Sequence, residues 1–284
     1  MTSPSAAPAS VAPRQRVHID GGQRRFPDLR ELRAYAPLIV LFGRRDITVR
    51  YRQTVLGTIW IFSGPLVSAG LFSLVFGRIA KLPSGGVPYF AFSYAGLLGW
   101  NLFSTTMSSA STSLNGNSSL ITKIYFPRLV LPLSTLASTL LNTVISFGMM
   151  VVILLVYGLG FSVHLILLPV WLLLAVALAM GIGFVLSSFG VLYRDVNYMT
   201  PILLSLLLYL SPVAYSTEAV PASLRTLYLL NPLTTIVEGC RWSLIGNGSL
   251  TGWAIAYTVG LSVAALIVGM AVFTRRESGF ADVI

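Results

Sequence analysis

The sequence predicts an all-α membrane protein with six transmembrane helices, and three observations lead to this fold class. First, 55% of the 284 residues are hydrophobic and only 10% are charged, whereas soluble domains are about 25% charged. Second, six apolar stretches approach or exceed the roughly 20 residues that cross a hydrocarbon core. Third, most basic residues fall in segments that would share one side of the membrane. An ordinary cytosolic enzyme and a disordered chain are therefore excluded.

The chain begins with a segment that differs in composition from the apolar stretches. Residues 1–13 are rich in Ala, Pro and Ser and carry no charge. They lack the basic start and apolar core of a signal peptide. We therefore expect residues 1–28 to be a disordered cytosolic tail.

An Arg-rich segment follows this tail. Residues 14–52 contain ten arginines and four acidic residues. From residue 32 onward, apolar residues alternate with basic ones, which predicts an amphipathic interface helix over residues 29–53 that Pro37 starts or breaks. The alternative is a solvated basic lead-in to the first span. The arginines expected to face lipid phosphates are Arg44, Arg45, Arg50 and Arg52.

The transmembrane domain is expected over residues 54–273, before a cytosolic C-terminal tail at 274–284. The predicted spans are 55–77, 89–113, 129–157, 165–191, 200–215 and 251–273. Between the last two spans, the half-apolar segment 216–248 contains two candidate short helices, each opened by a proline, at Pro221–Leu230 and Pro232–Ile245. We interpret them as a re-entrant helical pair, since irregular backbone at membrane depth needs protein or water around it.

The distribution of Lys and Arg predicts the orientation. With the N-terminus inside, the inner segments carry fifteen basic residues and the outer segments carry four. This asymmetry predicts that both termini are cytoplasmic. The net charge of +10 is therefore assigned to membrane orientation, and no nucleic-acid partner is expected.

Several absences limit the chemistry of the chain. Its only lysines, Lys81 and Lys123, do not follow a glycine-rich turn, so no P-loop for ATP is present. The six predicted spans contain no Asp, Glu, Lys or Arg, although such groups usually mark an ion path. His18 and His164 are far apart, and no metal-binding motif occurs. We expect a non-enzymatic subunit without cofactor or metal, driven by a partner.

A candidate docking segment for that partner lies between the second and third predicted spans. Serines can cap a short helix there, apolar side chains follow at helical spacing, and Pro127 ends it. The alternative is an interfacial helix that rests on lipid. The predicted contact residues are Ser118, Ser119, Leu120, Ile121, Lys123, Ile124, Tyr125, Phe126 and Pro127.

Aromatic residues gather near the predicted spans and offer a candidate channel lining. Interfacial Trp and Tyr belts are the alternative, although Trp100 and Phe103 lie deeper than a belt predicts. The Ser and Thr residues from Ser104 to Ser119 are interpreted as small residues that allow close helix packing. The predicted channel aromatics are Trp60, Phe62, Phe92, Tyr94, Trp100, Phe103, Tyr209 and Tyr215.

Two polar features remain. Glu238 and Arg241 stand three residues apart in the predicted re-entrant segment, so they can pair on one helix face, either as a structural ion pair or as part of a gate. Residues Tyr193–Asn197 form a charged segment that is expected to be a loop. This loop either anchors two spans or contacts a partner.

Five segments in order resemble the ABC-2 type permeases of polysaccharide export, such as those for O-antigen, teichoic acid and galactan. They are DITVRYRQTVLGTIWIFSGPL (46–66), ITKIYFPRLVLPL (121–133), YRDV (193–196), NPLTTIVEGCRW (231–242) and RRESGFADVI (275–284). The resemblance implies a homodimer in a bacterial cytoplasmic membrane, paired with two copies of an ATPase that binds ATP and Mg. It implies a polyprenyl-diphosphate-linked polysaccharide as substrate, an aromatic-lined channel and a coupling helix at the docking segment. Arg side chains would suit the diphosphate.

Three other functions stay open at this stage. An ABC-2 exporter of drugs or small molecules is the nearest alternative and would need no aromatic track. A membrane-embedded glycosyltransferase would need acidic groups, for which only Asp46 and Asp195 are candidates. A scaffold without transport explains neither the docking segment nor the gate-like pair. The sequence does not identify the polymer.

Overall fold

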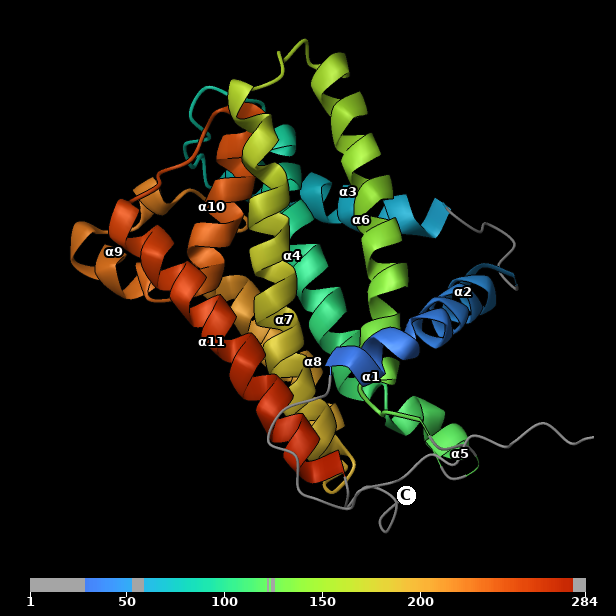
Figure 1. Cartoon of the computed structure of the whole chain (residues 1–284). Helices are drawn as coiled ribbons and strands as arrows, with labels where there is room; N and C mark the ends of the chain where they lie inside the picture. The colour runs from blue at the N-terminus through green and yellow to red at the C-terminus, as the bar shows by residue number, and fades with distance from the viewer. Residues whose placement is uncertain (1–28, 53–58, 122, 124–125, 278–284) are drawn as a thin grey trace, which may run out of the picture.

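The computed structural model describes residues 29–52, 59–121, 123 and 126–277, and within these ranges every regular element is helical (Figure 1). The predicted tail at residues 1–28 lies outside the described residues. The all-α prediction is confirmed for the described part of the chain. Its α-helices are α1 (Leu29–Ala34), α2 (Ala36–Arg52), α3 (Ile59–Phe72), α4 (Tyr89–Thr112), α5 (Ser118–Ile121), α6 (Val130–Val156), α7 (Leu168–Gly190), α8 (Asp195–Leu210), α9 (Ala222–Leu229), α10 (Pro232–Ile245) and α11 (Gly252–Arg276).

Shorter helical turns connect these helices. The π-helix η1 extends α3, and three 3₁₀ turns lie between longer helices: η1 (Ser73–Ile79), η2 (Asn115–Asn117), η3 (Val163–Leu167) and η4 (Thr217–Ala219). A helix therefore lies at each of the six stretches that the sequence predicted as spans. Three continuous helical stretches are long and apolar enough to cross a membrane: Val130–Val156, Val163–Gly190 and Gly252–Arg276. The six-span topology itself stays a prediction.

The fifth predicted stretch needed a correction. Helix α8 begins at Asp195 and ends at Leu210, not at 200 and 215, so most of the expected loop Tyr193–Asn197 is the first turn of a helix. An acidic residue in the first turn is favoured by the partial positive charge of the helix N-terminus. The helix ends before Pro212 because the residue that precedes a proline disfavours the α conformation.

The two short helices predicted after α8 are present. Helix α10 has the predicted bounds, and α9 begins one residue after Pro221. Asn231 caps α10 by accepting a hydrogen bond from the backbone N–H of Leu233 (3.1 Å). Gly246 ends α10 in the left-handed conformation that glycine adopts without strain (φ 70°).

Helix α4 is the centre of the bundle. It contacts α3, α6, α7, α8 and α10, and most of its side chains are buried. Of its Ser and Thr residues, Ser93, Thr106 and Ser111 are buried among other helices. Ser104, Thr105 and Thr112 donate hydrogen bonds to carbonyls of α4 itself, which satisfies these hydroxyl donors in an apolar bundle. The main apolar core forms around α4, α7 and α10.

A second apolar core forms at the end of the bundle where α5 lies, which we call the α5 end. Phe42 of α2 meets Phe126 edge to face, with ring centroids 5.9 Å apart. Helix α2 crosses α6 closely, since a Cβ on Gly43 would lie 2.6 Å from the Cβ of Ala137. The α5 end also gathers α1, α2 and the C-terminal ends of α7 and α11 (Figure 1). It therefore collects most of the basic segments of the described chain.

Candidate functional site

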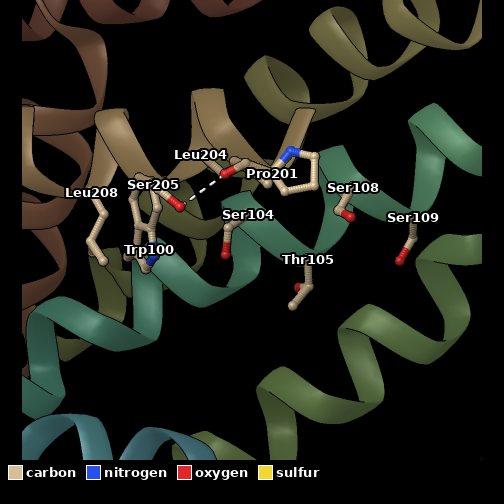
Figure 2. Close-up of a pocket in the computed structure, with 9 residues that line it drawn as sticks. All are labelled: Trp100, Ser104, Thr105, Ser108, Ser109, Pro201, Leu204, Ser205 and Leu208. Atoms are coloured by element: carbon tan, nitrogen blue, oxygen red, sulfur yellow. Dashed lines mark hydrogen bonds between the residues drawn. The ribbon is translucent and has the colours of Figure 1, made fainter. Parts of the chain in front are cut away.

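A groove lies between α4 and α8, with a volume of about 420 Å³. Helix α4 contributes residues spaced mostly four apart, so that they share one helix face, while α8 supplies mainly apolar side chains (Figure 2). The lining residues are Trp100, Ser104, Thr105, Ser108, Ser109, Pro201, Leu204, Ser205 and Leu208. One wall therefore carries hydroxyl groups and an indole ring, and the other wall is mostly aliphatic.

The groove carries no ionisable side chain among these lining residues. Several of its hydroxyls donate to carbonyls of their own helix: Ser104 donates to Asn101 (3.3 Å), and Ser205 donates to Pro201 (2.9 Å). A hydroxyl oxygen that donates in this way can still accept a hydrogen bond. The groove therefore offers acceptors and apolar surface to a neutral, polar solute without fixing it through charge.

The predicted channel aromatics differ in their burial in the structure. Trp100 lines the groove with only a small part of its surface, since it is 5% exposed and belongs to the main core, and Phe103 packs against it with ring centroids 5.9 Å apart. Phe92, Tyr94 and Phe103 are buried in the protein, so the prediction that they line a channel is wrong for this conformation of the chain. Their burial follows from their place on the enclosed helix α4. Tyr209 is 69% exposed, Tyr215 is half-buried, and the side chains of Trp60 and Phe62 lie outside the described part.

Sequence reasoning missed the hydroxyl wall of the groove. The serines of α4 were interpreted only as packing residues, and Pro201, Leu204, Ser205 and Leu208 were not singled out. The sequence pattern that could have predicted this wall is the four-residue spacing of Trp100, Ser104 and Ser108. This spacing places an aromatic ring and two hydroxyls on one helix face. The partner wall on α8 carries no such polar pattern.

The predicted pair of Glu238 and Arg241 is present and buried. Arg241 has no exposed surface, and its Nη1 lies 3.3 Å from Glu238 Oε1. Glu238 also accepts a hydrogen bond from the backbone N–H of Thr217 (3.1 Å). A buried ion pair persists when additional hydrogen bonds satisfy both partners, and these contacts supply some of them.

Arg241 also holds the chain that leaves α8. Its guanidinium donates to the carbonyl oxygens of Val213 and Tyr215 and lies over the ring of Phe92 at 3.9 Å. Gly96 makes room for it, since a Cβ there would be 2.7 Å from Arg241 Nη2. One buried side chain thus joins α10, α4 and the segment after α8, which favours the structural interpretation of this pair.

The predicted docking segment is only partly exposed. Ser118–Ile121 form helix α5, Ser119 and Lys123 are exposed, and Leu120 is half-buried. Ile121 and Phe126 are buried in the second core, so the prediction that Ile121 presents an apolar side chain to the cytosol is wrong. Burying these two apolar side chains against α2 and α6 is more favourable than leaving them exposed to water. Pro127 is half-buried, and Ile124 and Tyr125 lie outside the described residues.

The predicted lipid-facing arginines differ from one another. Arg44 is exposed beside an apolar groove between α2 and α6. Arg45 instead donates to Asp46 Oδ1 (2.9 Å) and to Asn117 Oδ1 (2.7 Å), so part of its hydrogen-bonding capacity is used inside the protein. The side chains of Arg50 and Arg52 lie outside the described part.

The described residues include no group of three or more His, Cys, Asp or Glu side chains that could hold a metal ion. The lone Cys240 is buried in α10.

Several known proteins have sequences similar to this chain. Residues 37–245 match the ABC-2 type transporter family. An O-antigen export system permease protein of Myxococcus xanthus is 28% identical over 90% of this chain and 98% of its own length. A Klebsiella pneumoniae protein with the same name is 26% identical over 87% and 95%, respectively. The polysialic acid transport protein KpsM of Escherichia coli is 25% identical over 82% and 91%.

Proposed function

The chain belongs to the ABC-2 type transporter family, and we propose that it is the permease subunit of an ATP-driven exporter of cell-envelope polysaccharide. It is a multi-pass inner-membrane protein. The observation that carries the proposal is the similarity, over nearly the whole length of each relative, to permeases named for O-antigen export and a protein named for polysialic acid transport.

The groove between α4 and α8 supports a carbohydrate substrate. Sugar rings have apolar C–H faces and a rim of hydroxyl groups. The exposed edge of Trp100 and the aliphatic side chains of α8 offer apolar surface for the first, and the serines and threonine of α4 offer hydrogen-bonding groups for the second. An uncharged surface suits a polymer that must slide, since strong ionic contacts would hold it in place.

Energy comes from a separate ATPase in this proposal, because the sequence contains no P-loop motif. Two copies of the ATPase bind ATP and Mg and dock at the α5 end. Ser119 and Lys123 are exposed there. Closure of the ATPase dimer displaces the segment around α5, and that displacement widens or narrows the channel.

A second copy of this chain completes the channel. Helix α8 is apolar and largely exposed, and it borders the groove. A partner copy packed against α8 covers this face and closes the groove into a passage. The exposed apolar residues of α8 include Met199, Ile202, Leu203, Leu206 and Leu210.

In the membrane, the six predicted spans place both termini and α5 in the cytoplasm, with α9 and α10 as a re-entrant pair at the outer side. The gathering of basic segments at the α5 end supports this orientation. The substrate is linked to a polyprenyl diphosphate, and Arg44 is the described arginine best placed to meet its phosphates, because it is exposed at the edge of an apolar groove.

Reconstitution into proteoliposomes tests the proposal. The chain with its ATPase should move a lipid-linked polysaccharide across the bilayer when ATP is supplied, and the chain alone should not. ATP-dependent movement of small amphiphiles without any polymer would favour the drug exporter instead. Uphill transport by the chain without an ATPase would contradict the proposal.

A further inference from the structure

Three polar contacts join the segment around α5 to three distant helices. By this segment we mean α5 with the described residues that flank it, from Asn115 to Arg128. In the first, Arg45 of α2 donates from Nη2 to Asn117 Oδ1 (2.7 Å). Arg45 is itself oriented by Asp46, whose Oδ1 accepts from Nε (3.1 Å) and Nη2 (2.9 Å). Asn117 is oriented in turn, because its Nδ2 donates to the carbonyl of Ser113 (2.9 Å). Both partners are therefore oriented by residues close to them in the sequence.

The second contact reaches α7. Asn115 Nδ2 donates to the carbonyl oxygen of Gly190, the last residue of α7 (3.1 Å). The last carbonyls of a helix have no partner within the helix, so Asn115 satisfies one of them. The end of α4 and the end of α7 are thereby tied together.

The third contact reaches α11. The backbone N–H of Arg128 donates to Glu277 Oε1 (2.6 Å), and its guanidinium also donates to the Glu277 carbonyl. Glu277 is the C-cap of α11. The preceding Arg276 lies over the ring of Phe189 of α7 at 3.9 Å, so the ends of α7 and α11 are joined to each other as well.

Apolar packing lies beneath these contacts. Phe42 meets Phe126 at 5.9 Å, and Phe184 meets Phe273 at 5.8 Å between ring centroids. The polar contacts stand at the edge of this core and join residues 72, 75 and 149 positions apart in the sequence. Three separated points of attachment restrict both sliding and rotation of the segment, which apolar packing alone allows more readily because it is not directional.

We propose that Asn115, Asn117 and Arg128 are positioning residues that lock the segment around α5 to α2, α7 and α11, so that an ATPase displacing this segment moves the three helices together. The transmission step rests on the proposed function, whereas the lock does not. In this arrangement Asn117 is the polar link to α2. Its loss leaves α2 joined to the segment by apolar packing alone, while the contacts to α7 and α11 persist.

A distance measurement tests the lock without any transport assay. Spin labels at Leu41→Cys and Gly116→Cys report the separation of α2 from the segment, since Leu41 is exposed and a Cβ at Gly116 meets no atom within 4 Å. Cys240 is fully buried and stays unlabelled. Pulsed electron spin resonance on the purified full chain should give a narrow distance distribution. Asn117→Ala and Arg45→Ala should each broaden it.

Two further variants provide the control and the rescue. Arg44→Ala removes the same charge from the neighbouring position, and the Arg44 guanidinium has no hydrogen-bond or ion-pair partner among the described residues, so the distribution should stay narrow. Asn117→Asp keeps an acceptor oxygen for Arg45 but loses the donor to the Ser113 carbonyl, so its distribution should be narrower than that of Asn117→Ala and broader than that of the unsubstituted chain. Unchanged distributions in both Asn117→Ala and Arg45→Ala would overturn the lock.

The transport arm uses the reconstituted complex with its ATPase. Asn117→Ala should leave ATP hydrolysis in place and lower the polymer exported per ATP, because the displacement of the segment is no longer passed to α2 through this contact. Asn117→Asp should recover part of the loss. A broadened distance distribution with unchanged export per ATP would overturn transmission through this contact. If the unsubstituted complex exports no polymer, the proposed function fails, and the distance measurement still decides whether the lock exists.

Discussion

Gly181 of α7 and Gly269 of α11 meet backbone to backbone, so closely that a Cβ on Gly269 would overlap the carbonyl group of Gly181. Small residues at such crossings allow helix backbones in a membrane protein to approach each other. The pair α7 and α11 has the most extensive contact of any two helices in the described chain. This crossing also sets the position of the α11 end that contacts Arg128.

Gly269→Ala should therefore destabilise the chain. The added methyl group meets backbone atoms that cannot move away without shifting a helix, and overpacking of this kind costs about 1–3 kcal/mol. Thermal unfolding in detergent can be followed by the reaction of buried Cys240 with a thiol dye. Gly260→Ala on the same helix is the control, because its Cβ meets no atom within 4 Å. Equal unfolding temperatures for the two variants would contradict the close crossing.

Arg241→Met should destabilise the chain more strongly. The substitution leaves Glu238 buried without its cationic partner and removes the donors to Val213 and Tyr215. Removal of one partner from a buried ion pair costs about 3–5 kcal/mol. The same unfolding assay measures the effect, and adding Glu238→Gln should recover part of the loss. If the double variant is less stable than Arg241→Met alone, the stranded carboxylate is not the cause.

Phe103→Ala should destabilise the chain strongly, whereas Tyr209→Ala should leave its stability almost unchanged. Phe103 is fully buried, and truncation of a buried Phe costs about 3–5 kcal/mol. Tyr209 is 69% exposed, and substitutions at such positions usually change stability by less than about 0.5 kcal/mol. If the Phe103→Ala protein is as stable as the unsubstituted chain but exports less polymer, Phe103 lines the channel and its description as a core residue is wrong.

Ser205→Trp should block the groove without unfolding the chain. Ser205 is exposed and lines the groove, so a large side chain there fills the space opposite Trp100. Export by the reconstituted complex should fall sharply while the unfolding temperature stays close to that of the unsubstituted chain. Val144→Trp, at an exposed position on α6, controls for the added ring. Normal export by Ser205→Trp would exclude the groove as the path.

A cross-link tests the dimer face. Ile202→Cys introduces a thiol on the exposed side of α8, and mild oxidation in native membranes should give a covalent dimer. Val144→Cys on α6 is the matched control and should remain a monomer on a non-reducing gel. Efficient cross-linking at Val144 and none at Ile202 would move the interface from α8 to α6.

The sequence by itself determined where the helices lie. Long apolar stretches and the prolines and glycine at Pro221, Pro232 and Gly246 indicate where long helices and the two short helices lie, although α8 begins five residues before the predicted position, because helix formation and termination depend largely on local residues. The sequence also predicted the pairing of Glu238 with Arg241, because a separation of three residues places both side chains on the same face of a helix.

Only the tertiary structure decided which side each helix turns inward. Phe92 and Phe103 proved to be core residues, Trp100 lines a groove, and Asn117 meets Arg45 from 72 positions away. Lipid tails are as apolar as a protein core, so hydrophobic side chains along a span do not reveal whether they face lipid, a neighbouring helix or a channel. That choice depends on contacts between helices, which local sequence does not encode.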